Sequence, residues 1–456
     1  MRKLKSKISL LNKTYQFNSL REILAKANEE KSGDQLAGIA AEDAQERLAA
    51  RHLLSELTLS DIRNNPVLPP EGDEVSRVIE EAINEKIYQS IANWTISELR
   101  EYLLSENTTN IEISRIRRGL TSEMVAAVTK IMSNMDLIQA ASKIEVVTQC
   151  NYPIGFKGTL AGRAQPNHPT DNIQGIRASL YEALSYGIGD AVVGINPVID
   201  TIESVKQILE MTKEEIDRFS IPTQNCVLAH VTTQMRAIKN GAPSDLLFQS
   251  LAGTEEGNKA FGISVDLLNE ANDLIQKEST SQGPNLWYFE TGQGSELSSD
   301  AHHKIDQVTL ESRCYGLARK YKPFIVNTVV GFIGPEYLYN SKQVIRAGLE
   351  DHFMGKLQGL PMGVDVCYTN HMNADQNDME NLAILLGSAG VNFLIGVPMA
   401  DDCMLNYQST SFHDIASVRR VLGLRPAPFF EKWLEKMGLM ENGILTERAG
   451  DPTIFI

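Results

Sequence analysis

Short runs of β-branched and aromatic residues recur along the chain from residue 144 onward, and segments with helical apolar spacing separate them. Strands that alternate with helices predict a parallel sheet, because each helix carries the chain back to the start of the next strand. Eight such units fit a closed (β/α)8 TIM barrel of the α/β class better than an open, doubly wound sheet. The eight runs are 144–147, 191–195, 226–229, 246–249, 286–289, 324–329, 362–366 and 393–397.

The organisation of the rest of the chain follows from its helical patterns. Between the runs, helices are expected at 173–186, 232–240, 265–275, 312–321, 342–356 and 378–390. Before them, the apolar spacing predicts helices that begin at a capping box (19–22) and continue at 40–54, 75–92, 95–105 and 121–141. We therefore expect a helical N-terminal domain (1–115), a catalytic barrel (116–400) and a short helical C-terminal extension packed on the barrel (401–456). The N-terminal part shows no catalytic grouping, so its expected role is packing or assembly.

Charge and cysteine usage narrow the possible partners. The formal net charge of −15 argues against nucleic acid or an anionic membrane and is compatible with a cationic ligand. No stretch approaches the roughly 20 apolar residues of a membrane span, so a soluble chain is expected. The five cysteines are scattered and form no CxxC pair, which argues against a disulfide framework or a zinc ribbon. These features predict a reducing compartment, the cytoplasm, and no metal held by cysteines.

Polar side chains follow most of the predicted strands. In (β/α)8 barrels the catalytic residues gather at the carboxyl ends of the strands, so these positions are candidate site residues. A loop after the first run carries two of them, and the others lie at or just beyond the later runs. They are Arg163, Gln165, Asn196, His230, Ser250, Glu290, Asn327, Asp365, His371, Asp401 and Asp402.

Glu290 and Asp365 are the strongest of these candidates. Glu290 directly follows an apolar strand, where desolvation raises a carboxyl pKa unless a cation compensates. Asp365 lies between Val364 and Val366, so its side chain faces the barrel interior if the valines face the outer helices. Either carboxylate has a structural alternative, which is an ion pair with a cation of the barrel.

The remaining candidates carry weaker signals. Arg163 is expected in a shaped loop, because glycine and proline flank it. His230 and His371 could be general bases or metal ligands, but no HxH or HExxH spacing supports a metal. Asp401 and Asp402 are equally well explained as a helix cap or as solvated acids.

Four long and unusual strings identify a family resemblance. They are FETGQGS (289–295), NTVVGFIGPE (327–336), EDHFMGK (350–356) and RAGDP (448–452), and the chain resembles the large subunit of ethanolamine ammonia-lyase from residue 15 to its last residues. The resemblance implies a barrel enzyme that uses adenosylcobalamin for the radical deamination of ethanolamine to acetaldehyde and ammonia. It also implies a small-subunit partner, self-association into a large hetero-oligomer, and a bacterial microcompartment as the cytoplasmic location.

The resemblance also assigns roles to individual residues. Arg163, Gln165, Asn196, Glu290 and Asp365 match substrate-binding positions, and Arg163, Glu290 and Asp365 are expected to be catalytic. Asn196, Ser250, Val329 and Phe332 match positions near the adenosyl group or the pocket wall. The string around His352 nearly spells a motif that replaces the cobalamin base with histidine, but it lies in a predicted barrel helix. The resemblance therefore implies base-on cobalamin and no protein ligand to a metal.

Three other functions stay open at this point. A diol dehydratase-like eliminase would act on a vicinal diol, and a metal-dependent lyase or aldolase would lose activity with a chelator. A non-catalytic scaffold would have no use for the polar set at the strand ends.

Overall fold

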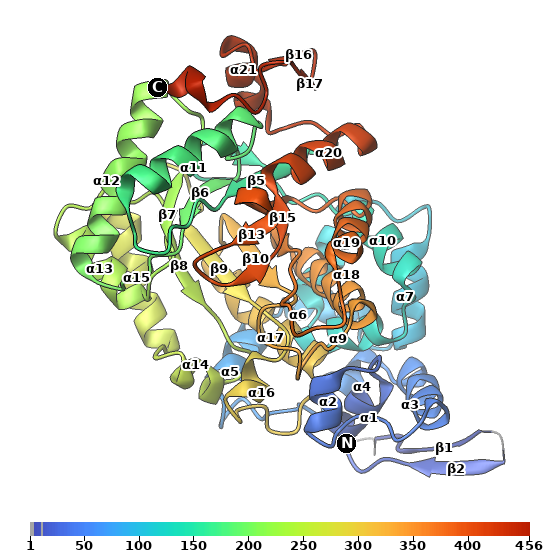
Figure 1. Cartoon of the computed structure of the whole chain (residues 1–456). Helices are drawn as coiled ribbons and strands as arrows, with labels where there is room; N and C mark the ends of the chain where they lie inside the picture. Colours follow the sequence, from blue (N-terminus) through green and yellow to red (C-terminus); the bar gives the residue numbers. More distant parts are fainter. Residues whose placement is uncertain (1–3, 11) are drawn as a thin grey trace.

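Eight parallel strands form the centre of the computed structural model, which describes residues 4–10 and 12–456 (Figure 1). The backbone hydrogen bonds give the order β7-β6-β5-β12-β11-β10-β9-β8. The two ends of this order meet where the backbone N–H of Leu246 donates to the carbonyl of Asn225 (3.3 Å). The predicted (β/α)8 barrel is therefore confirmed. Its strands are β5 (Ala161–Ala164), β6 (Val192–Ile195), β7 (Asn225–Val227), β8 (Leu247–Ser250), β9 (Trp287–Thr291), β10 (Ile325–Val329), β11 (Met362–Asp365) and β12 (Phe393–Val397).

Seven of the eight barrel strands lie at the predicted runs, and the first does not. The run 144–147 is not a strand, and β3 (Thr148–Gln149) just after it pairs only with β4 (Pro153–Ile154). The first barrel strand is β5, whose sequence Ala-Gly-Arg-Ala contains no β-branched residue. Gly162 explains part of this composition, because a Cβ there would lie 2.8 Å from Ile188 Cγ2. Close packing against the outer layer therefore selects small residues over strand formers.

Helices surround the barrel as the repeating pattern predicts (Figure 1). Two of them, α17 and α18, are buried along nearly their whole length, because α5, α9 and α10 of the N-terminal part cover their outer faces. The outer helices are α11 (Ile173–Ser185), α12 (Ile202–Phe219), α13 (Val231–Lys239), α14 (Glu255–Ala260), α15 (Val265–Glu278), α16 (Ser295–Ser298), α17 (Gln307–Ala318), α18 (Ser341–Gln358), α19 (Gln376–Ser388) and α20 (Phe412–Leu422).

The N-terminal part is helical, but it begins with a hairpin that the sequence pattern did not predict. Two predicted helices are also divided: Asn84 caps a new helix within 75–92, and Ser133 begins another within 121–141. The elements are β1 (Lys7–Leu10), β2 (Lys13–Gln16), α1 (Leu20–Ala27), α2 (Ser32–Leu36), α3 (Ala44–Glu56), α4 (Leu59–Arg63), α5 (Glu74–Glu81), α6 (Glu85–Ile91), α7 (Ile96–Leu104), α8 (Asn110–Ile116), α9 (Ser122–Lys130) and α10 (Asn134–Ser142).

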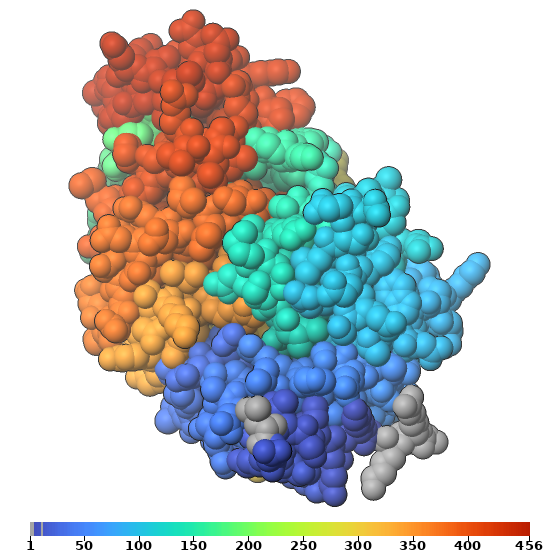
Figure 2. All heavy atoms as spheres, turned by 90° about the vertical axis from the view of Figure 1, so that its right-hand side faces the viewer, coloured from blue at the N-terminus to red at the C-terminus, as the bar shows by residue number. Residues whose placement is uncertain are grey.

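The C-terminal segment contains short strands as well as helices. A hairpin of β13 (Asp401–Asp402) and β14 (Tyr407–Gln408) lies at the barrel mouth, and β15 (Thr410–Ser411) pairs in parallel with β12. After α20 follow α21 (Pro428–Lys436) and a hairpin of β16 (Met440–Glu441) and β17 (Ile444–Leu445). The first helices of the N-terminal part (blue) and the segment from α20 onward (red) lie at opposite ends of the molecule (Figure 2). No helix within residues 4–10 and 12–456 has the length and apolar character of a membrane span.

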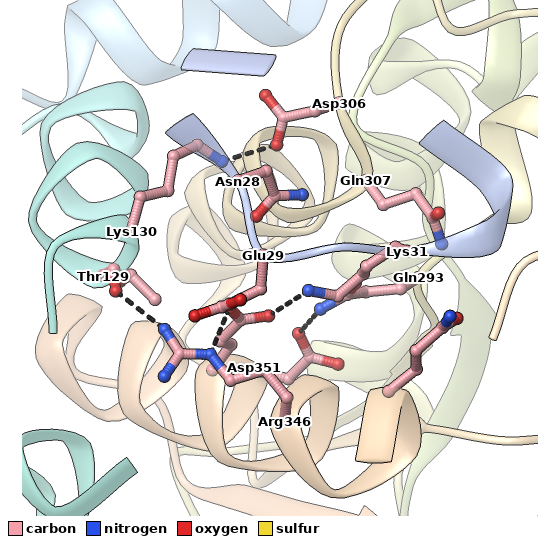
Figure 3. A network of polar contacts seen from close by, with 12 residues as sticks. Asn28, Glu29, Lys31, Thr129, Lys130, Gln293, Asp306, Gln307, Arg346 and Asp351 are labelled. Atoms are coloured by element: carbon pink, nitrogen blue, oxygen red, sulfur yellow. Dashed lines mark hydrogen bonds and ion pairs between the residues drawn. The ribbon is translucent and has the colours of Figure 1, made fainter. Parts of the chain in front are cut away.

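A buried ionic network joins the N-terminal part to the barrel helices (Figure 3). Lys31 Nζ and Arg346 Nε each lie 2.7 Å from a carboxylate oxygen of Glu350, and Lys130 Nζ lies 2.5 Å from Asp306 Oδ1. Burial would raise the pKa of Glu350, but the charges of Lys31 and Arg346 together lower it to about 2. Glu350 is therefore ionised at every physiological pH. Its buried negative charge is stabilised by both cations.

Replacing Lys31 by Met is expected to destabilise the fold by about 3 kcal/mol, because a buried carboxylate loses one of its two cations. The free energy of unfolding in urea measures the effect. The matched control is Lys213→Met, which removes a surface pair with Asp217 and should cost no more than about 0.5 kcal/mol. Equal losses in the two variants would contradict a stabilising role for the buried network.

Candidate active site

A cavity of about 420 Å³ opens at the carboxyl ends of the barrel strands. Seven of the eight site residues expected from the sequence line it: Gln165, Asn196, Ser250, Glu290, Val329, Phe332 and Asp365. Arg163 is the eighth and lies directly beneath the cavity. The lining described here contains two carboxylates, Glu290 and Asp365, and no lysine or arginine. The positions expected from the family resemblance thus converge on one site, and five of those lining it also lie at the strand ends that the barrel pattern indicates.

Glu290 projects into the cavity from β9. Its Oε1 accepts a hydrogen bond from Asn327 Nδ2 (2.9 Å) and lies 3.9 Å from Arg163 Nη1. Burial raises the pKa of Glu290, and Arg163 and Asn327 lower it in part. The side chain keeps 15% of its surface exposed. The ion pair with Arg163 is therefore loose, and Glu290 can still accept hydrogen bonds from a ligand.

Asp365 lies two strands away, at the end of β11. In the sheet, Asp365 is opposite Val329 of β10, and Glu290 is opposite Asn327 of the same strand. Val329 lies two residues beyond Asn327. Asp365 is therefore one layer nearer the mouth than Glu290. Tyr407 Oη donates to its Oδ2 (2.9 Å) and Ser409 Oγ to its Oδ1 (2.5 Å). Burial raises the pKa of Asp365 to about 7 despite these two donors.

Arg163 is part of strand β5, and the prediction that it lies in a loop was wrong. Its guanidinium crosses the barrel interior and donates to Tyr288 Oη (2.5 Å) and to Asn196 Oδ1 (2.8 Å). Only 1% of the residue is exposed, and its Nε has no hydrogen-bond partner among the described atoms. Burial lowers the pKa of Arg163, but Tyr288 and Glu290 outweigh it and raise the value overall. Arg163 therefore forms a charged floor under the cavity.

Asn196 and Gln165 are held so that one amide atom of each stays free. Asn196 Oδ1 accepts from Arg163, and its backbone N–H donates to Asn167 Oδ1 (2.8 Å). Gln165 Nε2 donates to Asp402 Oδ2 (2.7 Å) and to Tyr407 Oη (2.8 Å). The Asn196 amide nitrogen and the Gln165 carbonyl oxygen thus remain available to a ligand in the cavity.

The cavity wall toward the mouth is mainly apolar. Phe332 is 40% exposed and packs edge-on against Tyr407, with ring centroids 5.2 Å apart. Val329 and Ser250 lie at the ends of β10 and β8 and complete this part of the lining. The site therefore has a polar floor and an apolar upper wall.

Of the weaker sequence candidates, some lie at the cavity and others lie away from it. His230 lines the cavity, but its ring nitrogens bond to Thr232 Oγ1 (2.8 Å) and the Phe261 carbonyl (3.1 Å). His371 and Asp401 are exposed and outside the described lining, whereas Asp402 is buried and orients Gln165. His352 is buried in α18, also outside that lining. Within residues 4–10 and 12–456, no group of three or more His, Cys, Asp or Glu side chains is placed to hold a metal ion.

Three side chains that contact the site were not predicted from the sequence. Tyr407 and Ser409 come from the C-terminal segment, which the strand-end rule does not cover. Tyr288 lies two residues before Glu290 on the same strand and therefore faces the same side, a periodicity that could have identified it. Asn327 is one of the polar residues predicted at the strand ends, where the sequence indicates no role for it. In the structure it donates a hydrogen bond to Glu290.

Comparison with known proteins gives a consistent result. Residues 15–448 match the family model described as ethanolamine ammonia lyase large subunit (EutB). The chain is 58% identical over 452 residues to the ethanolamine ammonia-lyase large subunit of Escherichia coli K12, which covers 99% of this chain and 100% of that protein. The corresponding protein of Salmonella typhimurium is 57% identical with the same coverage. Among solved structures, an aldolase of Thermotoga maritima (phospho-2-dehydro-3-deoxyheptonate aldolase) aligns with 62% of this chain and 76% of its own, with a TM-score of 0.38 and 10% identity.

Proposed function

The chain belongs to the family of ethanolamine ammonia-lyase large subunits, and from this premise we propose that it deaminates ethanolamine to acetaldehyde and ammonia. The observation that carries the proposal is the charge of the cavity. Two carboxylates line it, and Arg163 beneath the floor pairs only loosely with Glu290 (3.9 Å), which leaves Asp365 without an ion-pair partner among the described residues. A small cation is the ligand that such a site favours, since a desolvated carboxylate needs a positive partner.

The free hydrogen-bonding atoms match the groups of protonated ethanolamine. Its ammonium has three N–H donors, and Glu290, Asp365 and the Gln165 carbonyl oxygen are three acceptors. The hydroxyl of the substrate would accept from the Asn196 amide nitrogen, because Asn196 Oδ1 is already occupied by Arg163. We therefore assign substrate binding to these four residues and to Arg163 beneath them.

The charged residues would also serve the reaction. As the amino group leaves the carbon to which it is bound, Glu290 accepts or returns a proton at its carboxylate. Arg163, through its contact with Asn196, stabilises negative charge that develops on the substrate oxygen. Tyr288 and Tyr407 stay protonated, because burial raises the pKa of each phenol well above its usual range.

The upper wall and the rim of the cavity fit the cofactor that we propose, base-on adenosylcobalamin. Ser250, Val329, Phe332 and Asn196 would contact its adenosyl group. Exposed apolar side chains that follow β6, β10 and β12 surround the mouth and suit a broad, partly apolar ring system: Val198, Ile199, Phe332 and Met399. When bound, adenosylcobalamin supplies the radical chemistry that removes a hydrogen atom from the substrate. His230, a histidine of the described lining, already uses both ring nitrogens, which favours the cofactor's own base as the cobalt ligand.

A small-subunit partner is part of the same proposal. The relatives are named large subunits, and the apolar rim of the mouth is a surface that a second polypeptide would cover. We propose a hetero-oligomer of the two chains, located in the cytoplasm inside a bacterial microcompartment.

Product formation tests the proposed function. The chain is co-expressed with its small subunit, and acetaldehyde and ammonia are measured from ethanolamine with and without adenosylcobalamin. Cofactor-dependent release of both products is expected. Turnover of a vicinal diol instead would favour a diol dehydratase, and inactivation by a chelator would favour a metal-dependent lyase. A folded complex that binds cobalamin but turns over none of these substrates would contradict the proposal.

The activity is expected to fall in acid. Because the pKa of Asp365 is raised to about 7 by burial, this carboxyl is ionised above that pH and neutral below it. The substrate ammonium keeps its charge throughout this range. The specificity constant kcat/KM should therefore decrease about tenfold per pH unit below about 7, mainly through KM. A steady-state pH profile measures this, and a flat profile on both sides of 7 would contradict the assignment of Asp365 to the ammonium.

A further inference from the structure

A second, larger cavity lies at the opposite end of the barrel. Its volume is about 850 Å³, and its wall is built from the segments that precede β9, β10 and β11. The short helices η1 (Arg117–Gly119) and η2 (Arg319–Tyr321) form the other side. This cavity shares no lining residue with the cavity at the barrel mouth.

The charge of this second cavity is opposite to that of the whole chain. The chain carries a net charge of −15, yet the described lining has five cationic residues and one acidic residue, Glu145. The cations are Arg117, Arg118, Arg319, Lys320 and Lys322. Such a concentration of positive charge creates a local potential that attracts anions.

Arg117 and Arg319 are the two least exposed of these cations, and neither has a carboxylate partner among the described residues. Arg117 Nη1 is buried without a hydrogen bond. Its guanidinium lies against Gly359, where a Cβ would come within 2.8 Å of Arg117 Cζ. Burial and, to a smaller extent, the neighbouring charge of Arg117 lower the pKa of Arg319 to about 10. Two arginines without a carboxylate partner among the described residues are therefore near enough for their charges to repel.

The helix ends account for part of this arrangement. Arg117 follows the C-terminus of α8, and Arg319 follows that of α17. Helix carbonyls stabilise positive charge at such positions by about 0.3–1 kcal/mol. They do not supply an acceptor for Arg117 Nη1, which remains without a partner.

We propose that the cavity framed by Arg117 and Arg319 is a binding site for a small phosphate-bearing anion. A planar guanidinium offers paired N–H donors whose spacing matches two phosphate oxygens, so two of them can hold one phosphate group. The volume exceeds what a single phosphate fills, and Val147, Pro323 and Pro361 provide an apolar wall for an attached organic group. A phosphate ester thus suits the site better than a simple inorganic anion.

The location defines what the ligand would do. Asn285, Pro323 and Pro361 of the lining lie within two residues of the starts of the strands that carry Glu290, Asn327 and Asp365. A bound anion would neutralise the arginines and tie these strand starts together. It would stabilise the folded barrel by an amount that rises with the logarithm of its concentration relative to its dissociation constant, without entering the active site.

Calorimetric titration of the large subunit in complex with its small subunit tests the proposal. The probes are inorganic pyrophosphate and adenosine monophosphate, in a chloride buffer of constant ionic strength. One site per large subunit is expected for at least one probe, with tighter binding of the monophosphate if the apolar wall contributes. Arg319→Gln and, independently, Arg117→Gln should weaken binding about tenfold or more. Arg236→Gln is the matched control, because it removes one exposed positive charge outside the cavity.

The melting temperature gives a second readout that a purely structural arginine would not produce. Without anion, Arg319→Gln should melt at a higher temperature than the parent protein, because the repulsion from Arg117 and the cost of partly burying the charge are gone. The rise of melting temperature with added probe should then be lost in Arg319→Gln and kept in Arg236→Gln. Absence of binding to the parent protein, or equal binding to the parent protein and all three variants, would overturn the proposal. A changed assembly state of Arg319→Gln without probe binding would also overturn it, because acidic side chains of another chain would then fill the cavity.

Discussion

Replacing Glu290 by Gln is expected to lower kcat by about 10³-fold while leaving the fold intact. Gln has the same shape, but it removes one of the two negative charges of the cavity and can place an N–H against the substrate ammonium. Asn327, which donates to Glu290 Oε1, would still have a carbonyl oxygen to bond. The loss is therefore electrostatic and should appear in both kcat and KM.

The control for Glu290 is the same substitution at another buried glutamate. Glu215 accepts from Tyr181 Oη (2.8 Å) and pairs with Arg177 on the outside of the barrel. Glu215→Gln should change stability and leave kcat within about twofold of the parent protein. Comparable rates for Glu290→Gln and the parent protein, measured with saturating cofactor, would refute a role for Glu290 in the chemistry.

Replacing Arg163 by Ala is expected to reduce kcat/KM by roughly 10² to 10⁴. The variant loses the guanidinium, which donates to Asn196 Oδ1 (2.8 Å) and so orients that side chain. The same group is the cation nearest to Glu290, at 3.9 Å from its Oε1. Glu290 would then be more readily protonated, because Arg163 is the charge that lowers its raised pKa. Arg163 also lowers the pKa of Asp365, so the acid limb of the pH profile should move to higher pH in this variant.

Two further measurements separate this role from a general loss of structure. Arg163→Lys keeps the charge but cannot bond both Tyr288 and Asn196 in the same geometry, so it should recover only part of the activity. Added guanidinium at low concentration should restore some activity to Arg163→Ala by entering the space left under the cavity. Unchanged kcat/KM and an unchanged pH profile in Arg163→Ala would contradict its assignment to the site.

Much of the barrel follows from alternating patterns in the sequence, because most of its strands are apolar runs with strong β preference. The first strand does not, because β5 contains Ala161, Gly162 and Ala164 and owes its conformation to neighbours on both sides. Residues 144–147 have better strand formers and still form no strand. Tertiary packing overrides local preference at both places.

The candidate site was predictable where the strand-end rule applies and unpredictable where another segment enters. Glu290 and Asp365 were found because each lies at the carboxyl end of a barrel strand. Tyr407 and Ser409 have no such marker, since they come from a hairpin and a loop after the last barrel strand. The buried floor position of Arg163 was missed for a related reason, because the strand that carries it was assigned too early in the chain.

The attachment of Asp365 to the C-terminal segment has a consequence for synthesis on the ribosome. All eight barrel strands have been translated by Val397, but the hydroxyl donors for Asp365 come from Tyr407 and Ser409. Until those residues emerge from the exit tunnel, the nascent barrel has a buried carboxyl without its partners and an unfinished substrate pocket. A newly made chain therefore completes its binding site only after all eight barrel strands have been translated.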